Sequence, residues 1–119
     1  MKSIFTYIKN DQLEEIKQLV KKNSKVLQQR DLQQNTPLLL ATKLNKKEII
    51  NYLVKQKSNL NVQDNLGLTP LIYAAKNNDL ILIKKLLIKK AKPKLKNIYG
   101  ISALGYSIKY QNYSAFNFL

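Results

Sequence analysis

The sequence predicts an all-α fold made of stacked helix-turn-helix units. Thr36-Pro37-Leu38 returns as Thr69-Pro70-Leu71, and then at the same interval, in a looser form, as Ser102-Ala103-Leu104. Ala41 lies as far after the first tripeptide as Ala74 lies after the second. The interval is 33 residues, from position 36 to 69 and from 69 to 102. A fixed period of this length is typical of a solenoid, in which every unit buries its apolar side against its neighbours. Proteins of this kind usually bind partners rather than catalyse reactions.

The recurring tripeptide is predicted to begin the first helix of each unit. A threonine or serine hydroxyl at this point accepts a hydrogen bond from an unpaired backbone N–H, and proline lacks a donor that the first helical position does not need. Small residues at positions 41, 42, 74 and 75 allow the first helices to approach their neighbours closely. The unit therefore starts with a short, tightly packed helix.

Apolar pairs one helical turn apart predict the second helix of each unit. Ile49-Ile50 and Leu53-Val54 form one apolar stripe, and Leu82-Ile83 and Leu86-Leu87 form the next. The segments 59–65 and 92–99 contain Asn, Asp or Pro and are predicted to join consecutive units as extended turns.

The first unit carries the same pattern with one residue missing. Ser3-Ile4-Phe5 precedes Thr36-Pro37-Leu38 by the same interval that separates the later tripeptides, whereas the second helix, with Leu13 and Ile16, matches at an interval longer by one. We therefore predict a single domain over residues 1–119. Its units are an N-terminal cap at 1–30, two units at 31–63 and 64–96, and an incomplete unit at 97–119.

The segment 64–75, Asp-Asn-Leu-Gly-Leu-Thr-Pro-Leu-Ile-Tyr-Ala-Ala, resembles the ankyrin repeat, and the segment 90–94 resembles its closing turn. The resemblance covers essentially the whole chain. It implies an ankyrin-repeat solenoid of helix-turn-helix units joined by extended hairpin turns, acting as a scaffold that binds a protein partner.

Two departures from the family pattern stand out. Gln34 occupies the place of the turn glycine that is kept as Gly67 and Gly100, and a left-handed backbone there would cost on the order of 1 kcal/mol. The family's histidine after Thr-Pro-Leu is replaced by Leu39, Ile72 and Gly105.

Composition leaves little for enzyme chemistry. The chain has no histidine and no cysteine, which excludes the common catalytic triads, thiol nucleophiles, and imidazole or thiolate metal sites. Asp31 and Asp64 lie one repeat apart and are expected to form hydrogen bonds inside the turns. We predict no catalysis and no cofactor for this segment, although it could belong to a longer enzyme.

The resemblance implies that a partner contacts the hairpin tips and the exposed side of the first helices, which line a concave groove. By position these are Leu32, Gln33, Asn35, Lys43, Leu44, Asn65, Leu66, Leu68, Lys76, Asn77, Ile98, Tyr99, Ile101, Lys109 and Tyr110. The many apolar residues among them predict an interaction surface. In the alternative interpretation, some of them fold back over the turns, Leu68 and Ile101 first.

A net charge of +14 would attract an acidic protein, nucleic acid or an acidic membrane. The densest cluster comprises Lys84, Lys85, Lys89, Lys90, Lys92, Lys94 and Lys96. Electrostatic binding of nucleic acid or acidic membrane through this cluster is the alternative function. The single arginine, Arg30, argues against specific base recognition.

The last unit is rich in large apolar residues and shows no polar cap. These residues are Tyr106, Ile108, Tyr110, Tyr113, Phe116, Phe118 and Leu119. Three explanations remain open: a longer array, a covering partner, or end-to-end self-association. No apolar stretch approaches the roughly 20 residues of a membrane span or forms a signal-peptide core, so the expected location is the cytoplasm, with secretion into a host cell left open.

Overall fold

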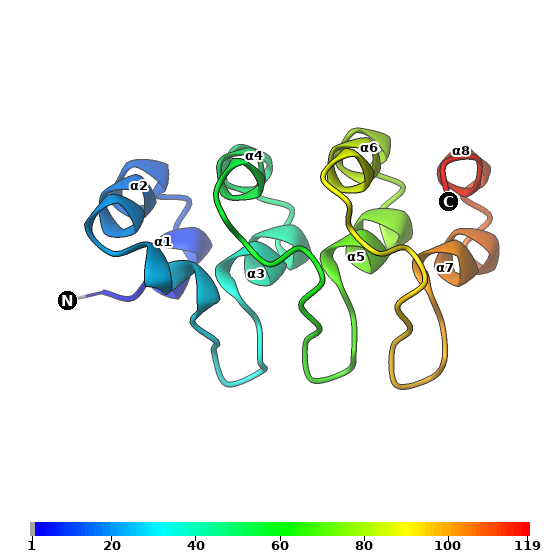
Figure 1. The fold of residues 1–119 in the computed structure, drawn as a ribbon, viewed down its shortest axis with the longest axis horizontal. Coiled ribbons are helices and arrows are strands. Elements are labelled where there is room, and N and C mark those ends of the chain that lie inside the picture. The colour runs from blue at the N-terminus through cyan, green and yellow to red at the C-terminus, as the bar shows by residue number, and fades with distance from the viewer. Residues whose placement is uncertain (1) are drawn as a thin grey trace. The chain divides into compact units, whose positions relative to one another are not determined.

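A computed structural model describes residues 2–119, apart from the side chain of Tyr113. Every regular element in this range is a helix, which confirms the predicted all-α class. The chain divides into two compact parts, each larger than one of the repeats described above. From here on, we call these parts unit 1 (Met1–Asn59) and unit 2 (Leu60–Leu119). Figure 1 labels the helices along the chain.

Unit 1 contains two pairs of helices. Its elements are α1 (Ile4–Lys9), α2 (Leu13–Lys22), the 3-10 helix η1 (Ser24–Gln28), α3 (Pro37–Lys43) and α4 (Lys47–Lys55). The helix α1 packs against α2 and α3, and α3 packs against α4. Ile8, Ile16, Leu38 and Leu53 are buried at the centre of these contacts.

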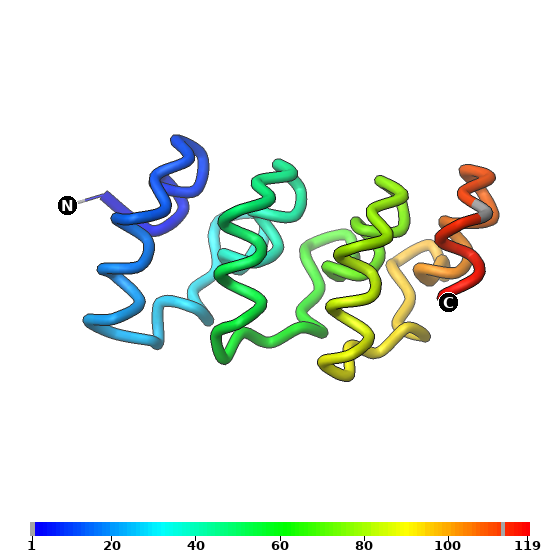
Figure 2. The backbone as a smooth tube through the Cα atoms, turned by 90° about the horizontal axis from the view of Figure 1, so that it is seen from above, coloured from blue at the N-terminus to red at the C-terminus, as the bar shows by residue number. Residues whose placement is uncertain are grey.

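Unit 2 repeats this arrangement. Its elements are α5 (Pro70–Lys76), α6 (Leu80–Ile88), α7 (Ala103–Lys109) and the single-turn α8 (Tyr113–Phe116). The helix α5 packs against α6 and α7, and α8 contacts both α6 and α7. Leu71, Ile72, Ile83 and Leu86 form its core. In this unit, Figure 1 shows α6 and α8 on the side opposite to the hairpin turns, and Figure 2 shows α6 lying over α5.

The predicted helix starts are confirmed at all four positions. Ser3, Thr36, Thr69 and Ser102 each accept a hydrogen bond from the backbone N–H three residues further on, at 3.2 to 3.4 Å. Pro37 and Pro70 occupy the start of the helix that follows. These caps fix where each first helix begins, and therefore where each hairpin turn must end.

The backbone conformation of the turns also repeats. Gln34, Gly67 and Gly100 have φ angles of 66°, 81° and 76°. All three lie in the left-handed region, where a side chain crowds the backbone. Gln34 therefore carries the backbone strain that the sequence predicts for a residue in the place of glycine.

Candidate functional site

One hydrogen-bonding pattern shapes all three hairpin tips. Asp31, Asp64 and Asn97 each accept two hydrogen bonds at their Oδ1 atoms, from the backbone N–H groups two and four residues further on, at 2.9 to 3.0 Å. The backbone N–H of each of these residues also donates to the carbonyl four residues on. The expected structural role of the two aspartates is confirmed, and the tip between these anchors is held in one conformation.

The remaining side-chain atom of each anchor in unit 2 is bonded to a tyrosine of a first helix. The Tyr73 hydroxyl of α5 donates to Asp64 Oδ2 at 2.6 Å. In α7, the Tyr106 hydroxyl accepts from Asn97 Nδ2 at 2.7 Å. Burial, then the hydrogen bond and the charge of Asp64, raises the pKa of Tyr73, which keeps its hydroxyl protonated as a donor. Both hairpins of unit 2 are thereby fastened to the helices that follow them.

Unit 1 satisfies its anchor in another way, and this corrects one prediction. Leu40 stands where unit 2 has Tyr73, and it offers no hydroxyl. Instead, Asn35 Nδ2 donates to Asp31 Oδ2 at 3.0 Å. Asn35 is consequently buried, with 2% of its surface exposed. The prediction that Asn35 lies on the partner surface is therefore wrong, because its amide is needed inside the turn.

In unit 2, Leu68 and Ile101 stand at the position that Asn35 occupies in unit 1, and both are at least partly buried. Leu68, predicted as a contact residue, is buried beneath its turn, so that prediction is wrong and the alternative interpretation holds. Burial of this leucine is favourable because it removes apolar area from water. Ile101 is half-buried.

The two hairpins of unit 2 are joined to each other close to their tips. The backbone N–H of Ile98 donates to the carbonyl of Leu66 at 3.0 Å. Gln63 Nε2 donates to the carbonyls of Gly67 and Lys96, both at 2.9 Å. These bonds fix the relative position of the two tips, so the side chains that they carry form a preorganised surface.

The remaining predicted residues of unit 2 lie at its surface. Ile98 and Tyr99 are 61% and 71% exposed, and Leu66 and Tyr110 are also exposed apolar residues. The exposed polar residues of the set are Asn65, Asn77 and Lys109, while Lys76 is half-buried. In unit 1, the exposed residues are Leu32, Gln33, Lys43 and Leu44.

Lysines and tyrosines alternate on the first helices of unit 2. Lys76 Nζ lies 5.6 Å from the ring centroid of Tyr73 and 5.4 Å from that of Tyr106. Lys109 Nζ lies 5.9 Å from the ring of Tyr106 and 5.8 Å from that of Tyr110, and these two rings are stacked. Such cation–π contacts restrain the two ammonium groups. Neither Tyr73 nor Tyr106 was predicted as part of this site, although their spacing of exactly one repeat is a visible signal.

The predicted lysine cluster lies on α6 and the turn after it. Lys85 is half-buried, and the exposed members are Lys84, Lys89, Lys90, Lys92, Lys94 and Lys96. The acids of unit 2 are Asp64 in its turn and Asp79, whose Oδ1 accepts from the Leu82 N–H at the start of α6. Unit 2 carries nine lysines against these two acids, so the field around the cluster is positive.

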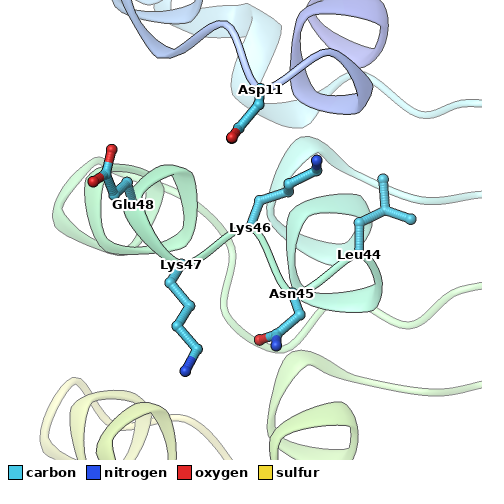
Figure 3. A pocket seen from close by; sticks show the side chains of 6 residues that line it. All are labelled: Asp11, Leu44, Asn45, Lys46, Lys47 and Glu48. Atoms are coloured by element: carbon cyan, nitrogen blue, oxygen red, sulfur yellow. The ribbon is translucent and has the colours of Figure 1, made fainter.

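Unit 1 has a depression of about 420 Å³, and Figure 3 shows the side chains that line it. Its lining residues are Asp11, Leu44, Asn45, Lys46, Lys47 and Glu48. Lys47 extends away from Asp11, and no lining residue is buried. Side chains of both signs, open to water, give no basis for assigning a ligand. Among residues 2–119 there is also no group of acids that could hold a metal ion.

A family model described as ankyrin repeats (3 copies) matches residues 45–119. The chain belongs to the ankyrin repeat family. Ankyrin repeats are generally protein–protein interaction modules, and the family typically provides binding scaffolds rather than enzymes. No protein in a search of curated proteins matched the chain. The longest helix between residues 2 and 119 has 10 residues. No helix in this range is long and apolar enough to cross a membrane.

Proposed function

We propose that this ankyrin-repeat chain binds a protein partner through its hairpin tips and first helices. In unit 2 we call this region the tip surface, formed by Asn65, Leu66, Lys76, Asn77, Ile98, Tyr99, Ile101, Lys109 and Tyr110. A second contact region in unit 1 consists of Leu32, Gln33, Lys43 and Leu44. The observation that carries the proposal is the exposure of Leu66, Ile98 and Tyr99 on two hairpins that are bonded to each other.

The tip surface has the properties of a binding site. Leu66, Ile98 and Tyr99 expose apolar area to water, and covering that area releases free energy. The hydrogen bonds at Asp64, Asn97 and Gln63 order the tips before any partner arrives, which lowers the entropy lost on binding. An aromatic residue with neighbouring aliphatic residues is also typical of positions that dominate interface energies.

The lysines of the tip surface favour an acidic partner. Lys76 and Lys109 are held over tyrosine rings, and the two carboxylates of unit 2 are engaged in the fold. A partner segment with Asp or Glu beside an apolar residue would complement this surface. Its charge would mainly accelerate association, while the apolar contacts would slow dissociation.

The proposal is tested by capturing partners from a lysate of the source cells, followed by titration of the purified partner at 50 and 200 mM salt. The test variant is Leu66→Asp/Tyr99→Asp. The matched control is Ile81→Asp/Ile88→Asp, which makes the same chemical change at two exposed residues of α6. We expect binding that persists at 200 mM salt, is lost in the tip variant and is kept in the control.

Two outcomes would contradict this function. Equal loss in both variants would show that added negative charge, rather than the tip surface, controls binding. A loss of roughly a thousandfold between the two salt concentrations would instead indicate a polyanion held by six to ten phosphate contacts.

The organisation of the whole chain follows as a second proposal. Residues 1–119 would form one domain of four ankyrin units, located in the cytoplasm. Ile108, Phe116 and Phe118 are exposed and would support end-to-end self-association, whereas Tyr106 is buried and cannot contribute. The side chain of Tyr113 lies outside the described part of the structure. Light scattering that shows a monomer at high protein concentration would exclude this association.

A further inference from the structure

The solvent side of α6 carries two projecting aliphatic side chains. Ile81 and Ile88 are 70% and 77% exposed, while Leu82, Ile83 and Leu86 of the same helix are buried. The two isoleucines are one heptad apart, so they lie about two turns apart on one stripe of the helix, with Lys84 between them. Their exposure means that nothing in the described structure covers them.

The two preceding repeats of this chain place charged residues at these positions. One repeat earlier, in α4, stand Glu48 and Lys55, and at the equivalent positions of α2 stand Glu14 and Lys21. All four are exposed. The fold therefore presents these two positions to water in three successive repeats, and only α6 fills them with isoleucine. Neither the core nor the stacking of repeats requires an apolar residue there.

Positive charge outweighs negative charge around the two isoleucines, although Asp79 caps the start of α6 two residues before Ile81. Residues 80–119 contain eight lysines and no acidic residue, and seven of these lysines lie in the segment 84–96. Lys84 Nζ is 4.7 Å from the ring centroid of Phe118, which is itself exposed. The patch therefore combines aliphatic, aromatic and cationic groups over α6 and the residues after α8.

We propose that this patch binds the surface of an anionic lipid bilayer, with Ile81 and Ile88 inserted at the boundary between headgroups and acyl chains. Lysines interspersed with projecting aliphatic residues are the combination that holds helices on such surfaces. Fluid lipid can take up projecting side chains without a preformed pocket. This site lies on α6 and is independent of the tip surface.

The alternatives fit the patch less well. Nucleic acid gains from lysines, but its contacts to protein depend on arginine and on stacking, which aliphatic side chains do not supply. A second copy of the chain would bring the same positive charge to the contact, and the repulsion between equal charges opposes that pairing. An anionic bilayer accepts both the charge and the aliphatic groups.

The chain itself suggests the variants that test this proposal. Ile81→Glu/Ile88→Lys installs the residues of α4 and leaves the net charge unchanged. Lys84→Asn/Lys89→Gln also installs the α4 residues, but removes two positive charges. Leu66→Ser/Tyr99→Ser changes the apolar tips without changing charge. Each variant is first compared with the wild type by urea unfolding, because these exposed positions should leave the midpoint unchanged.

Binding is measured by co-sedimentation with phosphatidylcholine vesicles that contain no phosphatidylserine or about one third phosphatidylserine, at 50 and 150 mM salt. We expect the wild type to bind only the anionic vesicles. Ile81→Glu/Ile88→Lys should bind at least about tenfold more weakly, since two inserted side chains are lost. Lys84→Asn/Lys89→Gln should bind about 25-fold more weakly at low salt, because each lysine near the surface contributes about fivefold. The tip variant should bind as the wild type does.

Four results would overturn the proposal. The first is no binding of the wild type to anionic vesicles, and the second is equal binding by Ile81→Glu/Ile88→Lys, which would reduce the patch to charge alone. The third is loss of binding in the tip variant. The fourth is a wild-type dimer in light scattering that Ile81→Glu/Ile88→Lys converts to monomer, which would make the patch a self-association surface. If the first result is found, binding of a polyuridine probe would assign the lysines to nucleic acid.

Discussion

Replacing Gly67 by alanine would test whether the two hairpins of unit 2 are truly fixed to each other. A Cβ atom at this position would lie 2.9 Å from Asn97 Cα and 3.0 Å from the Ile98 backbone nitrogen. Ordinary contacts of a Cβ lie at 3.4 Å or more. Gly100, one repeat later, has the same left-handed backbone but no atom within 4 Å of its Cβ position. The two glycines therefore separate backbone strain from collision with the next hairpin.

The expected costs follow from these distances. Gly100→Ala should lower the free energy of unfolding by about 1 kcal/mol, which is the cost of a left-handed backbone alone. Gly67→Ala carries the same strain and must also displace backbone rather than a flexible side chain, which adds roughly 1–3 kcal/mol. Its total cost should be about 2–4 kcal/mol.

Both variants are compared with the wild type by equilibrium urea unfolding, followed by circular dichroism and extrapolated to water. Partner capture provides a second measurement, since Gly67→Ala shifts the hairpin that carries Ile98 and Tyr99 without altering any exposed side chain. Equal destabilisation by the two substitutions would refute the argument. It would mean that the second hairpin moves aside without cost, and the tips would then not be preorganised.

Three further predictions concern single residues. Gln34→Gly should raise the free energy of unfolding by about 1 kcal/mol, measured by urea unfolding, because φ is 66° at this position; no gain would show that the loop relaxes. Thr69→Ala should lower the free energy of unfolding by about 1 kcal/mol, again measured with urea, since its hydroxyl accepts the Ile72 N–H at 3.2 Å. Tyr73→Phe should destabilise by about 1.5–3 kcal/mol near neutral pH, where its hydroxyl donates to a charged carboxylate. Because burial and Asp64 raise the pKa of Tyr73 above 10.0, this contribution is complete below pH 10.0 and falls as the pH rises further. Urea midpoints of wild type and Tyr73→Phe should therefore begin to converge above pH 10.0, and a constant difference there would show that folding does not raise the pKa of Tyr73.

Sequence alone was sufficient for features that recur in each repeat and depend on residues close together in the chain. The caps at Thr36 and Thr69 and the anchors at Asp31 and Asp64 satisfy backbone groups within four residues, so the repeat reveals them directly. The left-handed backbone at Gln34 could be anticipated for the same reason.

Prediction failed where the environment of a side chain depends on a residue further away. Asn35 is buried because Leu40 provides no hydroxyl for Asp31, and that requirement is visible only when both residues are placed around one turn. Ile81 and Ile88 were overlooked because α6 is apolar on most sides, so the helical pattern alone does not show which residues face water. Comparison with Glu48 and Lys55 at the same positions of the preceding repeat would have identified them.

The residues that hold each hairpin tip in shape differ from the residues that the tip exposes to a partner. In unit 2, the conformation of the tips is determined by Asp64, Gly67 and Asn97, and the exposed side chains between them accept no bond that the turn requires. Positions 65, 66, 98 and 99 can therefore change with little effect on stability. Natural variants could acquire new partners by drift at these four positions, and a combinatorial library restricted to them would retain a folded scaffold in most of its members.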